Sequence, residues 1–180
     1  MLNDTFSNQS IIPDNLPKVS SQEFTPLSPI YVKVNLMCRL TFWLIVVSVL
    51  LILYWQPWLI LPKPLELYLP QLQLAAGVFG LLTSVYGVIA DRNKGYALRE
   101  HDFSYRSGVI FKSVVSQPIL RIQHVELKHG PIDRHFGLSN LEIFSAGGSM
   151  HTFAIPGLPE GKARELRSYV LTHSDIAEND

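Results

Sequence analysis

The distribution of apolar and charged positions divides this chain into a strongly apolar first half and a mixed second half. An uncharged stretch of about 23 residues lies between Arg39 and Lys63, and another of about 24 lies between Glu66 and Asp91. A helix needs about 20 mainly apolar residues to cross a hydrocarbon core roughly 30 Å thick. The pattern therefore predicts a transmembrane hairpin at residues 33–94, with spans at about 40–61 and 68–90.

Positive charges flank the predicted hairpin on both outer sides. The basic residues next to the spans are Lys33 and Arg39 before the first, Arg92, Lys94 and Arg99 after the second, and Lys63 in the connection. Basic residues concentrate in cytoplasmic segments, so we expect both termini in the cytoplasm. Arg92, Lys94 and Arg99 are the juxtamembrane basic residues that we expect to lie near lipid headgroups.

Small residues recur along the second predicted span. Ala76, Gly80 and Ser84 are four residues apart, with Gly77 and Gly87 close to the same line. This spacing lets helix backbones approach closely. The face either packs on the first span or contacts a second copy of the chain. Neither span has an ionisable residue in its middle, which argues against a transporter or proton pump.

The first 32 residues differ from a folded segment in composition. They are rich in Asn, Ser, Gln and Pro, and no basic start leads into an apolar run, so the sequence predicts no cleavable signal peptide. We expect residues 1–32 to form a disordered cytoplasmic tail. The alternative is a short peptide that docks on a partner.

From Gly95 onward the apolar period changes from that of a helix to that of a strand. We expect strands around Tyr96–Leu98 and Phe103–Tyr105, a third over Val109–Val115, and a fourth over Ile122–Leu127 in which Ile122 and Val125 face opposite sides. A helical turn at Asp133–Phe136, a hairpin of Leu141–Phe144 and Thr152–Ile155 around Gly147–Gly148, and an amphipathic helix from Pro159 complete the pattern. The fold class is α+β: a two-helix transmembrane hairpin followed by a small antiparallel β-barrel or sheet that the C-terminal helix caps. The domain covers residues 95–173, and 174–180 form a tail.

Four motifs in this half resemble a known family. The motifs are Pro118–Val125, Gly130–Leu138, Ser145–Gly148 and Ile155–Leu158. In order and spacing they look like the bacterial pleckstrin-homology (PH)-like domain of membrane-flanked proteins, the YdbS-like group, which usually follows a membrane hairpin. The resemblance implies a PH-like fold, association with the bacterial inner membrane and no established enzymatic activity. The chain departs from the pattern at His135, where arginine is common, and at Ser145, where threonine is common.

The overall charge argues against one class of function, and the cysteine count limits the covalent chemistry. The formal net charge is zero, whereas a nucleic-acid binder shows a basic patch or stripe. Cys38 is the only cysteine, so no internal disulfide can form. It lies at the expected cytoplasmic edge of the first span, where either acylation or an ordinary buried thiol is possible.

The polar residues do not form a recognisable catalytic or metal-binding motif. His124, His129, His135 and His151 lack the spacing of a zinc site. Ser116, His124 and Asp133 include the residue types of a triad, but there is no nucleophile elbow and no phosphate-binding glycine loop. The sequence therefore predicts no catalytic residue, no metal site and no cofactor.

Four residues of the family motifs are candidates for binding a partner or a lipid headgroup: Arg121, Gln123, Arg134 and His135. Arg121 could equally pair with Glu126 or Asp133, and Arg134 with Asp133 or Glu142, while Gln123 could satisfy buried backbone groups. We expect a noncatalytic membrane-tethered module whose partners are the lipid bilayer and a protein, either a related PH-like membrane protein or another copy. Recognition of anionic lipid headgroups is the alternative.

Overall fold

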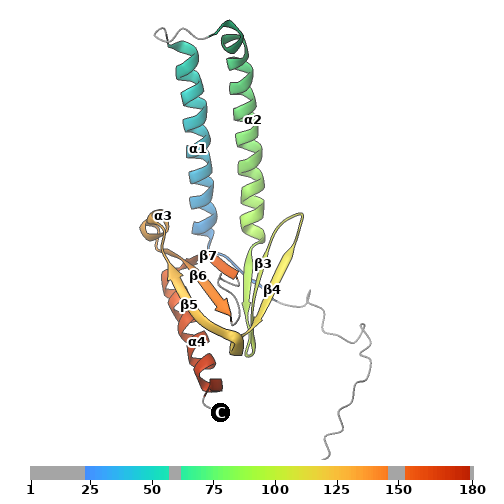
Figure 1. Cartoon of the computed structure of the whole chain (residues 1–180), viewed down its shortest axis with the longest axis vertical. Helices are drawn as coiled ribbons and strands as arrows, with labels where there is room; N and C mark the ends of the chain where they lie inside the picture. Colours follow the sequence, from blue (N-terminus) through green and yellow to red (C-terminus); the bar gives the residue numbers. More distant parts are fainter. Residues whose placement is uncertain (1–22, 57–61, 146–152, 179–180) are drawn as a thin grey trace, which may run out of the picture.

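Two long helices and a β-domain make up the protein in a computed structural model, which describes residues 23–56, 62–145 and 153–178 (Figure 1). Helix α1 (Pro29–Trp55) and helix α2 (Lys63–Asn93) run side by side, and the β-domain lies at the end where α1 begins and α2 ends. Ser28 caps α1 by accepting a hydrogen bond from the backbone N–H of Ile30, and Pro29 follows at a position where prolines suit a helix start.

Both helices are long and apolar enough to cross a membrane. Their outer surfaces are apolar and exposed, as at Leu44, Ile52, Leu74 and Leu81. In the most apolar stretch of α1, no residue is buried against the described protein. A helix in the core of a soluble protein would bury such residues. Both expected spans lie on these helices, except that residues 57–61 fall outside the described part of the chain.

The small-residue face of α2 packs on α1. A side-chain carbon at Gly80 would come within 2.7 Å of the Trp43 ring, and one at Gly87 would overlap the guanidinium group of Arg39. Ser84, between them, is buried and donates a hydrogen bond to the carbonyl of Gly80. Nothing lies near Gly77, which faces away. The structure therefore supports packing of the small-residue face on the first span.

The β-domain consists of two antiparallel sheets. One has the order β1-β2-β3-β4, with β1 Thr25–Pro26, β2 Gly95–Leu98, β3 Asp102–Ser107 and β4 Ser113–Pro118; the other has the order β5-β6-β7, with β5 Ile122–Lys128, β6 Leu138–Ser145 and β7 Phe153–Pro159. A 3-10 turn, η3 (Ile119–Arg121), connects the sheets, and α3 (Pro131–His135) follows β5. Within the described residues the sheets do not close into a barrel, but the antiparallel fold matches the expected PH-like class.

Helix α4 (Glu160–Glu178) covers the second sheet and completes the core (Figure 1). Its buried face is formed by Ala163, Leu166 and Val170. These side chains join a cluster of fully buried residues from the strands, among them Phe103, Leu141, Ile143 and Ile155. The cluster also takes in Tyr31 and Val34 of α1, so the core of the domain continues into the membrane hairpin.

Three expectations about local structure need correction. The run Val109–Val115 is not one strand: β4 begins at Ser113, and the preceding apolar residues form the tip of the β3–β4 hairpin. The fourth strand contains a bulge between Ile122 and His124, so that Ile122 and Val125 are both buried. The last helix begins at Glu160, because Pro159 still pairs with Leu138 in the sheet.

Regular structure begins before residue 33, the expected start of the hairpin. Thr25 and Pro26 pair with Tyr96 and Gly95 as an edge strand, and α1 starts at Pro29. Residues 1–22 of the expected tail lie outside the described residues, as does the expected Gly147–Gly148 turn.

Candidate functional site at the junction of hairpin and domain

The junction is organised around one buried carboxylate. The side chain of Asp91, in the last turn of α2, is 1% exposed. It accepts hydrogen bonds from Arg39 at 2.9 Å, Lys94 at 2.9 Å and Asn35 at 3.2 Å. Lys94 also donates to the hydroxyl of Tyr31 at 3.2 Å. We call these five residues the Asp91 cluster.

The Asp91 cluster joins α1 to the end of α2 and to Lys94, which immediately precedes β2. A buried charge is costly unless it is paired, and here two cations and an amide share one carboxylate. Burial would lower the pKa of Lys94, but hydrogen bonds and charge interactions with Asp91 and Tyr31 outweigh burial and raise it. Lys94 therefore stays charged. Its ammonium group donates to Tyr31 and Asp91 of the same chain and is not directed at lipid.

The family motifs meet at the same junction through a second set of contacts. The side chain of Asp133 accepts from the backbone N–H of Gly130 and from Asn140, both at 3.3 Å. Asn140 in turn accepts from the backbone N–H of Gly157 at 3.1 Å. The Gly157 backbone lies against the ring of Tyr31. An unbroken series of contacts thus leads from α3 to the membrane helices.

The four predicted binding residues do not form one site. Arg121 and Gln123 lie at the start of β5. Arg134 and His135 lie on α3, which follows the end of β5, and all four residues are exposed. The length of β5 beyond Gln123, five residues at about 3.3 Å each, places the first pair roughly 17 Å or more from the end of the strand that leads to α3. The anticipated ion pairs of Arg121 and Arg134 are absent from the described residues, because Lys128 bonds Glu142 at 2.7 Å and Asp133 is engaged as above.

The three juxtamembrane basic residues also have different environments. Lys94 belongs to the Asp91 cluster and Arg92 is exposed beside it. Arg99 is exposed at the far end of β2, which runs away from the hairpin, so about four strand residues separate it from the membrane end. Only Arg92 has the position expected for a headgroup contact.

The residues considered for catalysis are not brought together. Ser116 donates to Asp102 at 2.9 Å, and Ser104 donates to the same carboxylate at 3.0 Å, while His124 lies by Glu126 at 3.2 Å. Within the described residues no three His, Cys, Asp or Glu side chains are placed to hold a metal ion. His151 lies outside that part of the chain.

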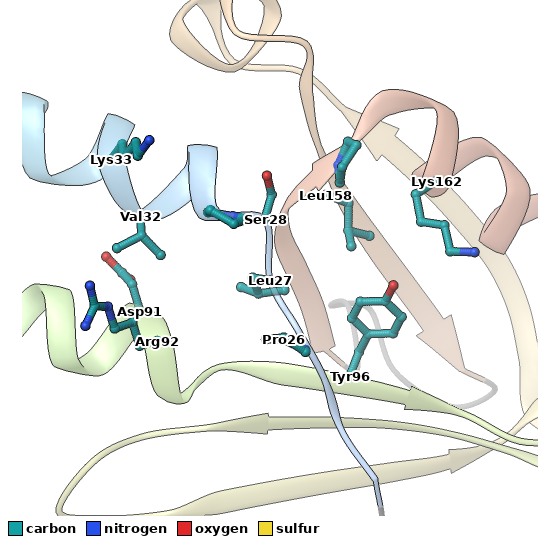
Figure 2. Close-up of a pocket in the computed structure, with 12 residues that line it drawn as sticks. Pro26, Leu27, Ser28, Val32, Lys33, Asp91, Arg92, Tyr96, Leu158 and Lys162 are labelled. Carbon is teal, nitrogen blue, oxygen red and sulfur yellow. The ribbon is translucent and has the colours of Figure 1, made fainter.

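A cavity of about 530 Å³ opens at the junction (Figure 2). Its walls are the N-terminal segment, the adjoining ends of α1 and α2, and the β7–α4 connection. Apolar side chains such as Leu27, Val32 and Leu158 line it, and Lys33, Arg92 and Lys162 bring positive charge to its walls. We call it the junction cavity. The cavity forms only because Thr25–Leu27 return to the domain sheet, and no pattern in the sequence indicates that return.

The Asp91 cluster was not predicted either, although the sequence carries a signal for it. The spans are nearly equal in length, and Arg39 and Asp91 bracket their outer ends. In an antiparallel hairpin, residues equally far from the turn come together. The sequence therefore predicts that the opposite charges of Arg39 and Asp91 lie close to each other.

Comparison with known proteins agrees with this architecture. The profile of the bacterial PH domain family matches residues 27–173, which include the hairpin as well as the β-domain. The chain therefore belongs to the bacterial PH domain family, and it is similar to a transmembrane protein of the YdbS type.

One curated relative illustrates the group. The UPF0699 transmembrane protein YdbS of Bacillus subtilis (strain 168) is 27% identical over 108 residues, a match that covers 59% of this chain and 66% of the relative. The match thus spans just under two thirds of that protein's length. No solved structure matches the chain significantly.

Proposed function

We propose that this protein is a noncatalytic module of the bacterial inner membrane, with both termini in the cytoplasm, whose PH-like domain mediates protein assembly at the cytoplasmic face. Its partner is another PH-like membrane protein or a second copy of the chain. The family and the transmembrane relative support anchoring and a non-enzymatic role, and the outward-flanking basic residues support the orientation.

The observation that carries the assembly proposal is the state of strand β4. It is the last strand of its sheet, and no described strand pairs with its outer edge. Its six residues, Ser113–Pro118, carry no charge, and Val114 is 40% exposed. Edge strands are usually protected by charged residues or covered, because an open edge pairs with another chain. An uncharged open edge is suited to strand addition by a partner.

The rigid junction supports the same proposal. The Asp91 cluster and the Tyr31–Gly157 contact fix the domain relative to the hairpin, so the β4 edge has a defined position beside the membrane. Two anchored proteins in one membrane meet in a restricted orientation, which raises the effective concentration of matching edges.

Substitution at the exposed β4 position tests the proposal. The full-length protein, crosslinked in its native membrane and extracted gently, should bring with it a PH-like protein or a second copy. Val114→Lys should abolish that recovery, because it places a charge on the pairing edge, whereas Val114→Thr keeps the β-branched shape and should preserve it. Equal recovery with both variants would contradict a role for β4. Turnover of a small molecule, lost on a point change in the domain, would contradict the noncatalytic role.

Recognition of anionic lipid headgroups is a second candidate, and the junction cavity favours it. Lys33 and Arg92 have no ion-pair partner among the described residues, whereas Lys162 is held by Glu165 at 2.9 Å. A phosphate group near Lys33 and Arg92, with apolar atoms against Leu27, would match both the charge and the lining. In nanodiscs the wild type should then retain phosphatidylglycerol over phosphatidylcholine even at raised salt.

Variants separate this candidate from nonspecific adhesion. Arg92→Gln should remove the lipid preference, and Arg121→Gln, at the far end of β5, should leave it intact. Equal loss in both variants would indicate that only overall charge matters.

A further inference from the structure

We infer that the tip of the β3–β4 hairpin is a membrane-inserting wedge, so that the domain contacts the anionic bilayer directly as well as through its helices. The tip, residues 108–112, carries Ile110 and Phe111, whose exposed fractions are 74% and 90%. A phenylalanine side chain so exposed in water forfeits about 1.5–3 kcal/mol of burial energy. No described part of the protein covers these two side chains.

The register of the strands places this tip on the membrane side of the domain. Strand β2 begins at Gly95, directly after α2, and runs away from the hairpin, while β3 runs back and pairs Arg106 with Gly95. Residues after Arg106 therefore extend past the end of α2, toward the bilayer. Figure 1 shows the loop of this hairpin rising beside the lower end of α2.

The reach of the tip matches the thickness of the headgroup layer. Two to three extended residues beyond Arg106 reach roughly 7–10 Å. A headgroup layer is roughly 5–8 Å thick on each side of the hydrocarbon core. The charges of the Asp91 cluster belong at the polar boundary, and Lys94 immediately precedes β2. Ile110 and Phe111 thus come to the level where aromatic and aliphatic anchors insert.

The shape and charge of the tip fit the same role. Gly108 has φ +96°, and a side-chain carbon there would overlap the carbonyl of Phe111, so the turn is tightly closed and presents the next residues outward. Lys112 follows the apolar pair, is exposed and has no ion-pair partner among the described residues. An apolar tip beside a lysine is suited to an anionic leaflet.

A second apolar projection lies on the other side of the hairpin. Ile132 and Phe136, on and just after α3, line an apolar cavity of about 460 Å³ together with residues of α1 that include Met37 and Phe42. Arg134 and His135 are exposed on the same short helix. Lipid chains could pack against this cavity, with headgroups near Arg134. The domain would then contact the bilayer on both sides of the hairpin, at α3 and at the β3–β4 tip.

Spin labelling of the full-length protein tests the wedge. In a Cys38→Ser background, nitroxide labels at Phe111→Cys, Ile110→Cys and the control Glu100→Cys are compared in nanodiscs that hold one copy each, in phosphatidylethanolamine with phosphatidylglycerol. Glu100 lies in the opposite turn, between β2 and β3. Both tip labels should collide with a water-soluble nickel chelate several-fold less often, and with oxygen more often, than the control.

Each other outcome overturns the inference. Tip labels as accessible to nickel as the control label would show that the tip is in water. Protection that appears only in vesicles with many copies, and is lost in single-copy nanodiscs, would make a second copy the occupant. Ile110→Cys leaves Phe111 in place, so loss of the aromatic side chain cannot by itself explain an exposed label. The measurement does not depend on assembly through β4.

Discussion

The ring of Tyr31, in the first turn of the first membrane helix, lies directly on the backbone of Gly157 in the last strand of the β-domain. Gly157 has φ +66°, and a side-chain carbon there would overlap the ring. The hydroxyl of Tyr31 accepts a hydrogen bond from Lys94, which binds Asp91. One aromatic side chain therefore joins the family's Ile155–Leu158 motif to the hairpin.

Gly157→Ala should destabilise the protein more than Gly137→Ala. Gly137 has nearly the same conformation, φ +64°, but nothing lies within 4 Å of it, so its variant should lose only the left-handed backbone cost of about 1–2 kcal/mol. Gly157→Ala adds overpacking against Tyr31, worth a further 1–3 kcal/mol or so. Chemical unfolding in detergent measures both. Equal losses would show that the Tyr31 contact is unimportant.

Asp91→Asn should destabilise the junction. The amide removes the charge that Arg39 and Lys94 share and leaves two cations close together, for a cost of about 2–4 kcal/mol. The exposed Glu100→Gln is the control and should change the free energy of unfolding by less than about 0.5 kcal/mol. Protease should also cut the hairpin–domain connection faster in Asp91→Asn. Unchanged stability and cleavage would mean that the cluster does not hold the domain.

Substitutions at two neighbouring glycines of α2 should have opposite effects. Gly80→Ala pushes a methyl group into the Trp43 ring and should cost about 1–3 kcal/mol. Gly77→Ala meets open space and should be neutral or stabilising by up to about 1 kcal/mol, since alanine favours helix. Thermal unfolding in detergent, followed by the near-ultraviolet signal of the tryptophans, reports both. A larger loss at Gly77 would indicate that a second copy packs on that side.

Alkaline pH should destabilise the protein through Tyr105. Burial raises the pKa of this phenol above its usual 10.0, and its ring stacks on Phe153. Below pH 10 both states keep the proton and its stabilising effect is complete. As pH rises further the unfolded chain ionises first, and the effect is lost by the folded-state pKa. Tyr105→Phe should therefore flatten the fall of Tm above pH 10.

Lys94 and Tyr96 have raised pKa values as well, so Tyr105→Phe should remove only part of the alkaline loss. Between pH 6 and 9, roughly, these three groups should leave Tm unchanged. A Tm profile above pH 10 that is identical in wild type and Tyr105→Phe would contradict the assignment.

The sequence predicted those parts of the fold that one strong physical constraint controls. Hydrocarbon tolerates only long uncharged helices, so the bracketing charges Arg39 and Asp91 located both spans. The four motifs predicted the PH-like class through their resemblance in order and spacing to a known family, and the family match over residues 27–173 confirms it.

The remaining features depend on contacts between distant residues. Thr25 and Pro26 form a strand only because Gly95 and Tyr96 offer an edge, and two residues carry no period of their own. Val109–Phe111 resembled part of a core strand. Apolar residues predict burial, but they do not indicate whether protein or lipid surrounds them. The binding residues proposed from motifs, Arg121 and Arg134, come from neighbouring motifs in the sequence, but Arg121 precedes β5 and Arg134 lies on α3, which follows β5.

Photocrosslinking from the β4 edge in native membranes tests the central claim most directly. A benzophenone amino acid replaces Val114 or, as control, Ser168 on the exposed face of α4. We predict covalent adducts with a PH-like membrane protein or a second copy from position 114, and none of these from position 168. Adducts with lipid alone at position 114, or the same proteins captured equally from both positions, would contradict assembly through this edge.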